Sequence, residues 1–207
     1  MDNQDYLDQI TASAQPTKPR GGITNIIPPL ALKLLIGGVI LAILIIVFGI
    51  IFGNMGTKTE DLAKQLSIRL NNVSETIDKY NPAIKSSQLR QYGSETKATI
   101  NNTQRDLNQF LEKKYGYKKP DTKSKMFTDE TDYIEKTNKE LEYARLNAFL
   151  DRVYVQQLMY QIEQITALES NINARTDNQE LKDIVNSSAT NLQNAHGSLE
   201  KVSETIK

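Results

Sequence analysis

Hydrophobic residues are distributed very unevenly along this chain. Leu34 to Phe52 form a run of 19 residues without a charge, which as a helix would cover roughly 28 Å, close to the thickness of a bilayer core. Pro28 and Pro29 precede the run, at the entry of a helix, where proline is tolerated. The run is longer than the apolar part of a cleavable signal peptide and begins far from the N-terminus. We therefore expect residues 29–53 to form one transmembrane helix, kept as a signal anchor.

The segment before this span has a different composition. Residues 1–28 contain several prolines and glycines and no sustained apolar period, which predicts a disordered polar tail. The basic residues that flank the span nearly balance, so they do not decide its orientation. Lys33 abuts the apolar run, and long segments translocate largely regardless of charge. Both favour a cytoplasmic N-terminus and an extracytoplasmic C-terminal domain, and the reverse orientation stays open.

Beyond the span, residues 54–207 show apolar positions every three or four residues, the spacing of amphipathic helices. The pattern predicts four helical segments: 57–80, 86–115, 128–173, and 176 to near the C-terminus. The first segment illustrates the repeat, with Leu62, Leu66, Leu70, Val73, Ile77 and Tyr80. A straight helix over 128–173 would be about 69 Å long, so we expect a bend or short loop near Arg145 to Asp151.

Helix starts are predicted from capping-box spacings. Thr57 and Glu60 have this spacing, as do two overlapping pairs that begin at Thr176 and Asp177. An acidic first turn after Thr128 suits the positive end of a helix. The segment 141–168 is apolar on more than one stripe, and Leu146 and Phe149 belong to these stripes; we expect it to be the most enclosed helix.

These elements define an all-α fold class. Valine runs that alternate with polar residues are absent after the span, so a β domain has little support. The last helix keeps a strict period of 3.5 residues, which favours knobs-into-holes packing. We expect a single N-terminal transmembrane helix followed by an antiparallel four-helix bundle over residues 54–207, with a long coiled-coil hairpin as the alternative.

Composition narrows the chemistry. The 25 basic and 25 acidic side chains balance, which argues against a nucleic-acid partner. With no Cys and one His, the chain has no thiol nucleophile, zinc ribbon, iron–sulfur site or disulfide. His196 has Gln at position 193, so a Glu-x-x-His metal motif is absent, as are GxSxG and glycine-rich phosphate loops. We expect no enzyme, no catalytic or metal-binding residue, and no cofactor.

Charge is segregated within the helical part. Residues 54–127 carry 14 basic and 8 acidic side chains, and residues 128–207 carry 8 and 14. One interpretation is that the two halves neutralise each other across the bundle. The other is that a lysine cluster contacts anionic lipid headgroups, a surface polymer or an acidic partner, at about 1 kcal/mol per lysine near a membrane. The lysine cluster comprises Lys113, Lys114, Lys118, Lys119, Lys123 and Lys125.

The predicted span contains a stripe of small residues. Gly38, Ala42, Gly49 and Gly53 are spaced 4, 7 and 4 residues apart and share one helix face. Small residues at such spacing let transmembrane helices approach closely. Self-association through this face is one hypothesis, and the ordinary frequency of glycine in membrane helices is the alternative.

An anchor followed by a helical bundle is similar in outline to LemA-type membrane proteins and to the sensor modules of chemotaxis receptors, and no functional residue is carried over from either. The sequence thus predicts a single-pass protein of the cell membrane whose bundle is a structural or protein-interaction module, with the bilayer and another protein, or a second copy, as partners. The alternative is a small-ligand sensing or carrier bundle, in which Tyr143, Tyr154 and Tyr160 would line a cavity.

Overall fold

A computed structural model describes residues 58–206. The chain divides into two units, Met1–Asn54 and Met55–Lys207, and the described residues belong to the second. Within them the secondary structure is entirely helical, so the all-α prediction is confirmed. The elements are α3 (Thr59–Tyr80), the short 3₁₀ helix η2 (Asn81–Ala83), α4 (Ser87–Tyr115), α5 (Lys125–Leu146), α6 (Leu150–Arg175) and α7 (Gln179–Ser203).

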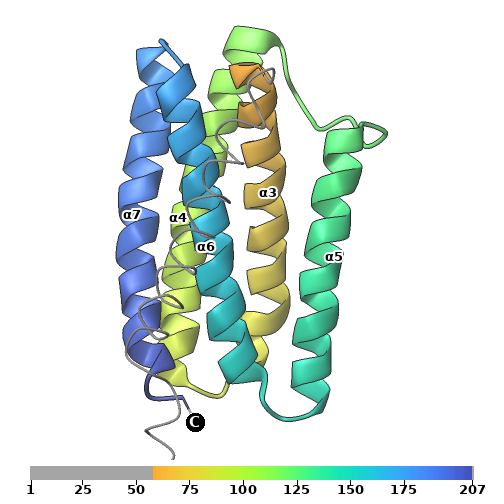
Figure 1. The fold of residues 1–207 in the computed structure, drawn as a ribbon, viewed down its shortest axis with the longest axis vertical. Coiled ribbons are helices and arrows are strands. Elements are labelled where there is room, and N and C mark those ends of the chain that lie inside the picture. Colours follow the sequence, from red (N-terminus) through yellow and green to blue (C-terminus); the bar gives the residue numbers. More distant parts are fainter. Residues whose placement is uncertain (1–57, 207) are drawn as a thin grey trace, which may run out of the picture. The chain divides into compact units, whose positions relative to one another are not determined.

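Successive α-helices run in opposite directions along the bundle (Figure 1). α3 packs against α4 and α6, and α7 packs against the same two helices, so these four surround one core. α5 lies outside this set and contacts α3 and α6. The arrangement is a bundle of four antiparallel helices with a fifth helix on one side.

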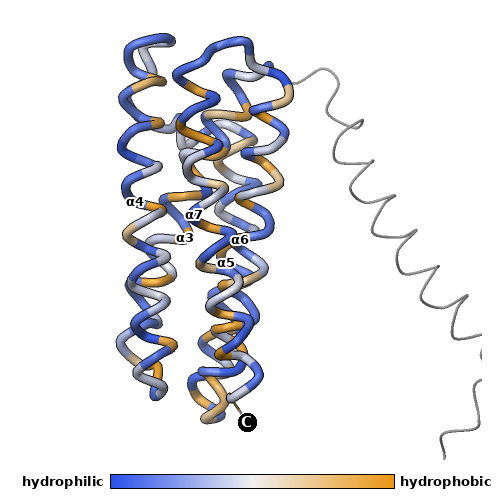
Figure 2. The backbone as a smooth tube through the Cα atoms, turned by 90° about the vertical axis from the view of Figure 1, so that its left-hand side faces the viewer, coloured by the Kyte–Doolittle hydropathy of each residue, from blue (hydrophilic) through white to orange (hydrophobic). Residues whose placement is uncertain are grey.

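The core consists of the apolar faces that the sequence period predicts. All six repeat positions of α3, from Leu62 to Tyr80, are buried, as are Leu181, Val185, Leu192, Leu199 and Val202 of α7. Figure 2 shows hydrophobic positions recurring between hydrophilic ones along each helix. Burial of these side chains is the main stabilising contribution, because each contributes roughly 1.5–3 kcal/mol when fully removed from water.

Three helix starts differ from the sequence predictions. α3 begins after Lys58, and Thr57 lies outside the described residues. α5 begins three residues before Thr128, because the Ser124 hydroxyl accepts a hydrogen bond from the Phe127 amide. α7 is capped by Asn178, whose side chain accepts from the Leu181 amide at 3.0 Å. Short polar side chains in extended backbone reach the third amide of a helix, and here Ser124 and Asn178 hold that geometry.

The predicted interruption near Arg145 to Asp151 is confirmed as a complete break. α5 ends at Leu146 and α6 begins at Leu150. Ala148 lies in the left-handed region, with φ of 64°. This conformation costs a residue with a side chain roughly 1–2 kcal/mol, and it allows α6 to turn back along α3.

No helix in residues 58–206 combines the length and hydropathy needed to cross a bilayer. The segment predicted as the anchor, residues 29–53, and the predicted tail, residues 1–28, lie outside this range.

Candidate functional site

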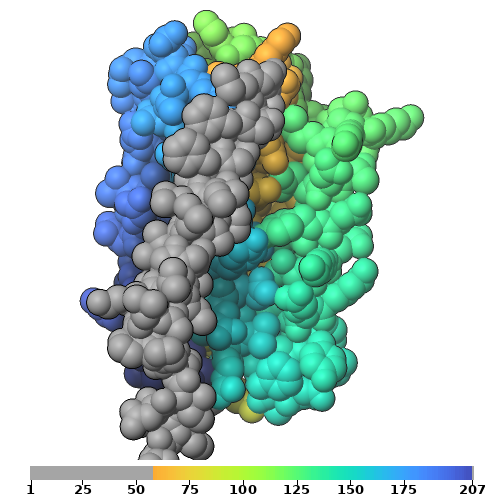
Figure 3. All heavy atoms as spheres, viewed as in Figure 1, coloured from red at the N-terminus to blue at the C-terminus, as the bar shows by residue number. Residues whose placement is uncertain are grey.

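The lysine cluster lies at the end of the bundle where α3 begins. Lys113 and Lys114 are in the last turn of α4, and Lys125 opens α5. The other three lysines belong to the connecting loop, residues 116–124, which projects from the bundle in Figures 1 and 3. Because α3 and α4 are antiparallel, the end of α4 lies beside the start of α3. The cluster therefore lies at the end of the bundle where α3 begins. We call this end of the bundle the lysine end.

The loop at the lysine end is fixed by its own hydrogen bonds. Gly116 adopts a left-handed conformation, with φ of 66°, and its amide donates to the Glu112 carbonyl at 2.9 Å. Glycine takes this conformation without steric cost, and so it ends α4. At the other side, the Ser124 hydroxyl donates to the Asp121 carbonyl at 2.7 Å, and the Lys123 amide donates to the Asp121 carboxylate at 3.0 Å.

Most of the charge at the lysine end is uncompensated. Lys113 lies 3.4 Å from Glu180 of α7, and both side chains are exposed. The other five ammonium groups of the cluster form no ion pair with any residue from 58 to 206. Within the segment 112–125 only Glu112 and Asp121 oppose six lysines. The cluster therefore has a local excess of positive charge, while α3 and α7 begin at the same end with Glu60, Asp61 and Glu180 in their first turns.

A cavity of about 230 Å³ lies beneath the loop. Its walls come from α3, α4, the loop and the start of α5, and many of them are polar. The amide and hydroxyl groups are those of Ser67, Asn71, Asn72, Gln104 and Asn108, and the loop contributes Tyr117, Lys118 and Lys119. Local sequence patterns do not indicate this cavity, because its helical walls are about 40 residues apart in the chain.

The opposite end of the bundle is apolar at its surface. Tyr143, Leu146 and Phe149 are 64%, 70% and 39% exposed, and the rings of Tyr143 and Phe149 meet edge to face with centroids 5.9 Å apart. We call these three residues the aromatic end. The expectation that Leu146 and Phe149 belong to an enclosed helix is wrong, because both lie at the turn between α5 and α6, where no other helix covers them.

A second cavity, of about 430 Å³, adjoins the aromatic end. Lys85, Arg145 and Arg152 line it together with Phe149 and Asp151. The Asp151 carboxylate is already engaged, because its two oxygens accept the amides of Lys85 at 3.0 Å and of Ser86. The cavity therefore offers cationic side chains beside exposed apolar ones.

The Asp151 contact has a structural role that sequence patterns did not indicate. It joins the first turn of α6 to the loop between α3 and α4, 65 residues earlier. The Ser86 amide donates to Asp151 at 2.8 Å, and the Ser86 side chain caps α4 by accepting from Leu89. The only local signal is an acidic residue in a first turn, which is common at helix starts.

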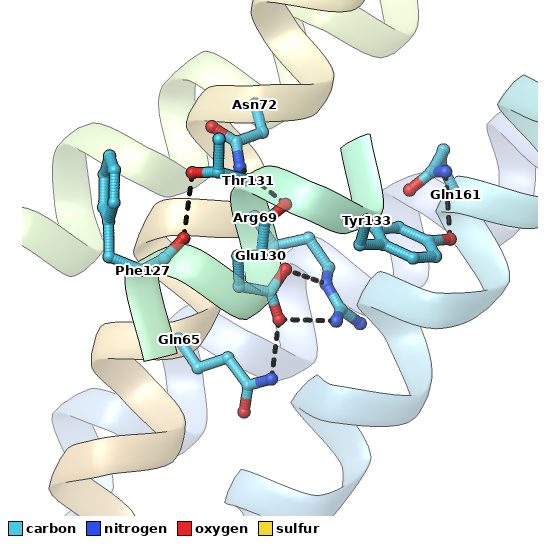
Figure 4. A network of polar contacts seen from close by, with 8 residues as sticks. All are labelled: Gln65, Arg69, Asn72, Phe127, Glu130, Thr131, Tyr133 and Gln161. Atoms are coloured by element: carbon cyan, nitrogen blue, oxygen red, sulfur yellow. Dashed lines mark hydrogen bonds and ion pairs between the residues drawn. The ribbon is translucent and has the colours of Figure 1, made fainter. Parts of the chain in front are cut away.

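A polar network fastens α5 to the bundle (Figure 4). Glu130 of α5 is 4% exposed and accepts from the Arg69 guanidinium of α3 at 2.6 and 2.9 Å. Gln65 of α3 donates to the same carboxylate at 2.7 Å, and the Arg69 guanidinium lies 5.5 Å from the centre of the Tyr133 ring. The paired geometry satisfies the buried carboxylate and the guanidinium, whose side chain is 14% exposed. This ion pair joins the basic and acidic halves of the domain.

Tyr133 extends the network to α6. The Gln161 side-chain amide donates to the Tyr133 hydroxyl at 3.0 Å. Burial raises the pKa of Tyr133 to about 12, assisted by the neighbouring Tyr160. The phenol is therefore neutral at physiological pH, where it serves as a hydrogen-bonding group between helices.

The side chains that could bind a metal ion or line a ligand cavity do not lie together. His196 lies at the surface, with Nε2 3.1 Å from an oxygen of Glu163. In the described part of the chain, no three His, Asp or Glu side chains are grouped so that they could hold a metal ion. Tyr143 and Tyr160 are exposed, whereas Tyr154 is buried and donates to the Asn81 side chain at 3.3 Å. The structure thus does not gather the three tyrosines around one cavity.

The small-residue face, Gly38, Ala42, Gly49 and Gly53, lies outside the described residues. No protein family model matches the chain, and neither a curated protein nor a solved structure matches it.

Proposed function

We propose that this protein is a non-enzymatic, single-pass membrane protein whose helical bundle acts as an interaction module at the cell surface. The observation that carries this function is the chemical difference between the two ends of the bundle. The lysine end suits an anionic membrane surface, and the aromatic end suits a protein partner.

Chain connectivity supports the membrane side. Residues 54–58 link the predicted span to α3, and five residues reach at most about 18 Å. The start of α3 is then held close to the headgroups. Lysines gathered at this end of the bundle add attraction to anionic lipids, which falls off within a Debye length of the surface.

The partner side follows from the length of the helices. α3 has 22 residues, which corresponds to roughly 33 Å, so the aromatic end projects away from the end that the anchor holds. Exposed aromatic and aliphatic side chains are typical of the centres of interfaces. Lys85 and Arg152 lie beside them, whereas Arg145 is already paired with Glu142 at 2.6 Å, so the partner surface is apolar with acidic residues facing Lys85 and Arg152.

A photo-crosslinking amino acid placed at position 146 of the full-length protein in intact cells tests this function. We expect a specific protein adduct that falls at least fivefold when Tyr143→Ser is added, or when Arg152→Glu reverses the neighbouring charge. A crosslinker at Tyr160, which is 45% exposed on the side of α6, is the matched control and should not give the same adduct. Equal adducts from both positions, or a protein that leaves the membrane on alkaline extraction, would contradict the proposal.

The small-ligand carrier is the second candidate, and the 430 Å³ cavity favours it, because ligand pockets commonly have volumes of about 300–1,000 Å³. Its lining combines Lys85 and Arg152 with apolar side chains such as Phe149 and Leu150, which suits a small anion with an apolar part. Thermal unfolding of the full-length protein in neutral detergent, with and without a panel of small carboxylates, separates the candidates: a shift that Lys85→Gln and Arg152→Gln abolish would favour the carrier.

A further inference from the structure

The cavity beneath the loop at the lysine end is lined by groups that donate hydrogen bonds. Lys118 and Lys119 line it from the loop, and their ammonium groups form no ion pair with residues 58–206. From α4, Asn108 contributes a side-chain amide, whereas the Gln104 amide already donates to the Asn71 side chain at 3.2 Å. Among the described residues that line this cavity, none is acidic.

Some of this hydrogen-bonding capacity is unused within the described chain. The Asn108 side-chain oxygen accepts from the Ser67 hydroxyl at 2.6 Å, which leaves the Asn108 amide hydrogens without a partner among residues 58–206. The Tyr117 hydroxyl is shielded from solvent, and the Ser67 side chain is the polar group beside it. Buried polar groups in native proteins are nearly always paired with protein, water or ligand. These donors therefore favour an acceptor that enters the cavity.

The backbone adds to the positive potential. α5 begins at Lys125, and Phe127 in its first turn lines the cavity. The Phe127 amide itself is taken up by the Ser124 hydroxyl at 3.2 Å, so the contribution of α5, which has 22 residues, is the partial positive charge at the amino end of its dipole. The lysines, the amides and the helix end thus act on the same small volume.

From these features we infer that this cavity binds the phosphate group of an anionic ligand. Lysine binds phosphate as a point charge, and the side-chain amides supply directed hydrogen bonds. A volume of about 230 Å³ admits a headgroup and is below the usual range for larger ligands. If the lysine end faces a bilayer, as the proposed function requires, the source is a phospholipid with a phosphate monoester headgroup. Inorganic phosphate carries the same chemistry from solution.

The test uses full-length protein in neutral detergent and isothermal titration calorimetry. The titrants are dioctanoyl phosphatidic acid, dioctanoyl phosphatidylcholine and inorganic phosphate. Asn108→Asp places a carboxylate in the cavity with almost no change in shape. Asn101→Asp is the matched control, because Asn101 lies two turns earlier on α4 and accepts from Ser74 at 2.8 Å in the same way, but does not line the cavity.

A second pair of variants distinguishes binding in the cavity from general attraction to the lysine cluster. Lys118→Gln with Lys119→Gln removes two charges that line the cavity, and Lys123→Gln with Lys125→Gln removes two from the same cluster that do not. All four substitutions fall on exposed side chains, so the fold should survive them. Circular dichroism checks that the helix content is unchanged.

We expect the affinity for phosphatidic acid to fall at least tenfold in Asn108→Asp and in the Lys118/Lys119 variant. In the two controls, Asn101→Asp and the Lys123/Lys125 variant, the affinity should stay within twofold of that of the natural protein. Phosphatidylcholine should not bind. Equal losses in both lysine variants, or no binding of either phosphate monoester, would overturn the inference. Inorganic phosphate that binds as tightly as the lipid would support the phosphate site and assign it to a soluble ligand. Binding measured in detergent requires neither a bilayer nor a protein partner. The result of the calorimetry is therefore independent of the crosslinking test of the proposed function.

Discussion

At the scale of single residues, Glu169 is a carboxyl group inside the bundle. It lies on α6 and is 1% exposed, and the polar group beside it is the Ser188 hydroxyl of α7. Burial raises the pKa of Glu169 to about 8, and the nearby Ser188 opposes this only in part. A buried carboxyl avoids the cost of desolvating its charge by remaining protonated.

The raised pKa predicts that stability depends on pH. Between the ordinary pKa of 4.5 and about 8, the unfolded chain loses this proton while the folded chain keeps it. The free energy of unfolding should therefore fall as pH rises through this window and level off above it, by roughly 3–5 kcal/mol in total from this group.

Glu169→Gln tests this dependence. The amide matches the protonated acid in shape, so the variant should equal the natural protein at pH 5 and exceed its melting temperature at pH 8.5. Thermal unfolding of the full-length protein in neutral detergent measures both. Glu163→Gln, an exposed substitution on the same helix, is the control. If the melting temperature of Glu169→Gln depended on pH in the same way as that of the natural protein, Glu169 would not be the source of the pH dependence.

Ala148 offers a second prediction at this scale. Its φ of 64° strains any residue with a Cβ. Ala148→Gly removes that strain, while the greater freedom of glycine in the unfolded chain offsets part of the gain. We expect a net increase in stability of about 0.5–1 kcal/mol. Ala195→Gly, inside α7, should instead lower stability by about 1 kcal/mol; a loss of stability in both variants would show that the turn is unstrained.

At the scale of elements, α5 differs from the four helices around the core. Its buried residues are Glu130, Ile134, Thr137, Leu141 and Ala144, so two of the five are polar. By contrast, α6 buries eleven residues. Fewer buried apolar contacts make an element easier to open. α5 is therefore the helix that depends most on its polar contacts to α3 and α6.

The Arg69–Glu130 pair should carry much of that attachment. Arg69→Met leaves the Glu130 carboxylate buried without its partner, which costs about 3–5 kcal/mol. Amide hydrogen exchange should accelerate in α5 more than in α4 or α7. Adding Glu130→Met should restore most of the stability, since no buried charge then remains. Lys64→Met breaks a half-exposed pair within α3 and should change stability by less than about 1 kcal/mol; a similar effect from both single variants would argue against the network.

At the scale of the whole molecule, the predicted anchor bears on how copies of the protein would meet. We propose that the face formed by Gly38, Ala42, Gly49 and Gly53 mediates self-association of the predicted span. Gly49→Ile together with Ala42→Ile should reduce crosslinked dimers in membranes at least threefold, because close approach requires small side chains. Leu44→Ile, on the opposite face of the same predicted helix, should leave dimers unchanged. Equal dimer yields in all three proteins would contradict this proposal and favour the alternative, that the stripe reflects the ordinary frequency of glycine in membrane helices.

The sequence alone determined features that depend on near neighbours. The three-and-four spacing from Leu62 to Tyr80 identified a buried face, because helical geometry relates such positions locally. The length of the segment 128–173 indicated a break, and the break occurs at residues 147–149. The lysine cluster was also visible, since its members lie within 13 consecutive residues. The starts of α5 and α7 were misplaced, because a cap depends on backbone angles that residue type does not specify.

Only the tertiary structure decided which distant groups share a site. Ser67 and Asn108 are 41 residues apart, and their contact beneath the loop exists because α3 and α4 pack side by side. The apolar residues Leu146 and Phe149 read as core in sequence, yet they are exposed because no helix covers the turn that holds them. Periodicity reports which face of a helix is apolar, whereas burial depends on whether another element lies against that face.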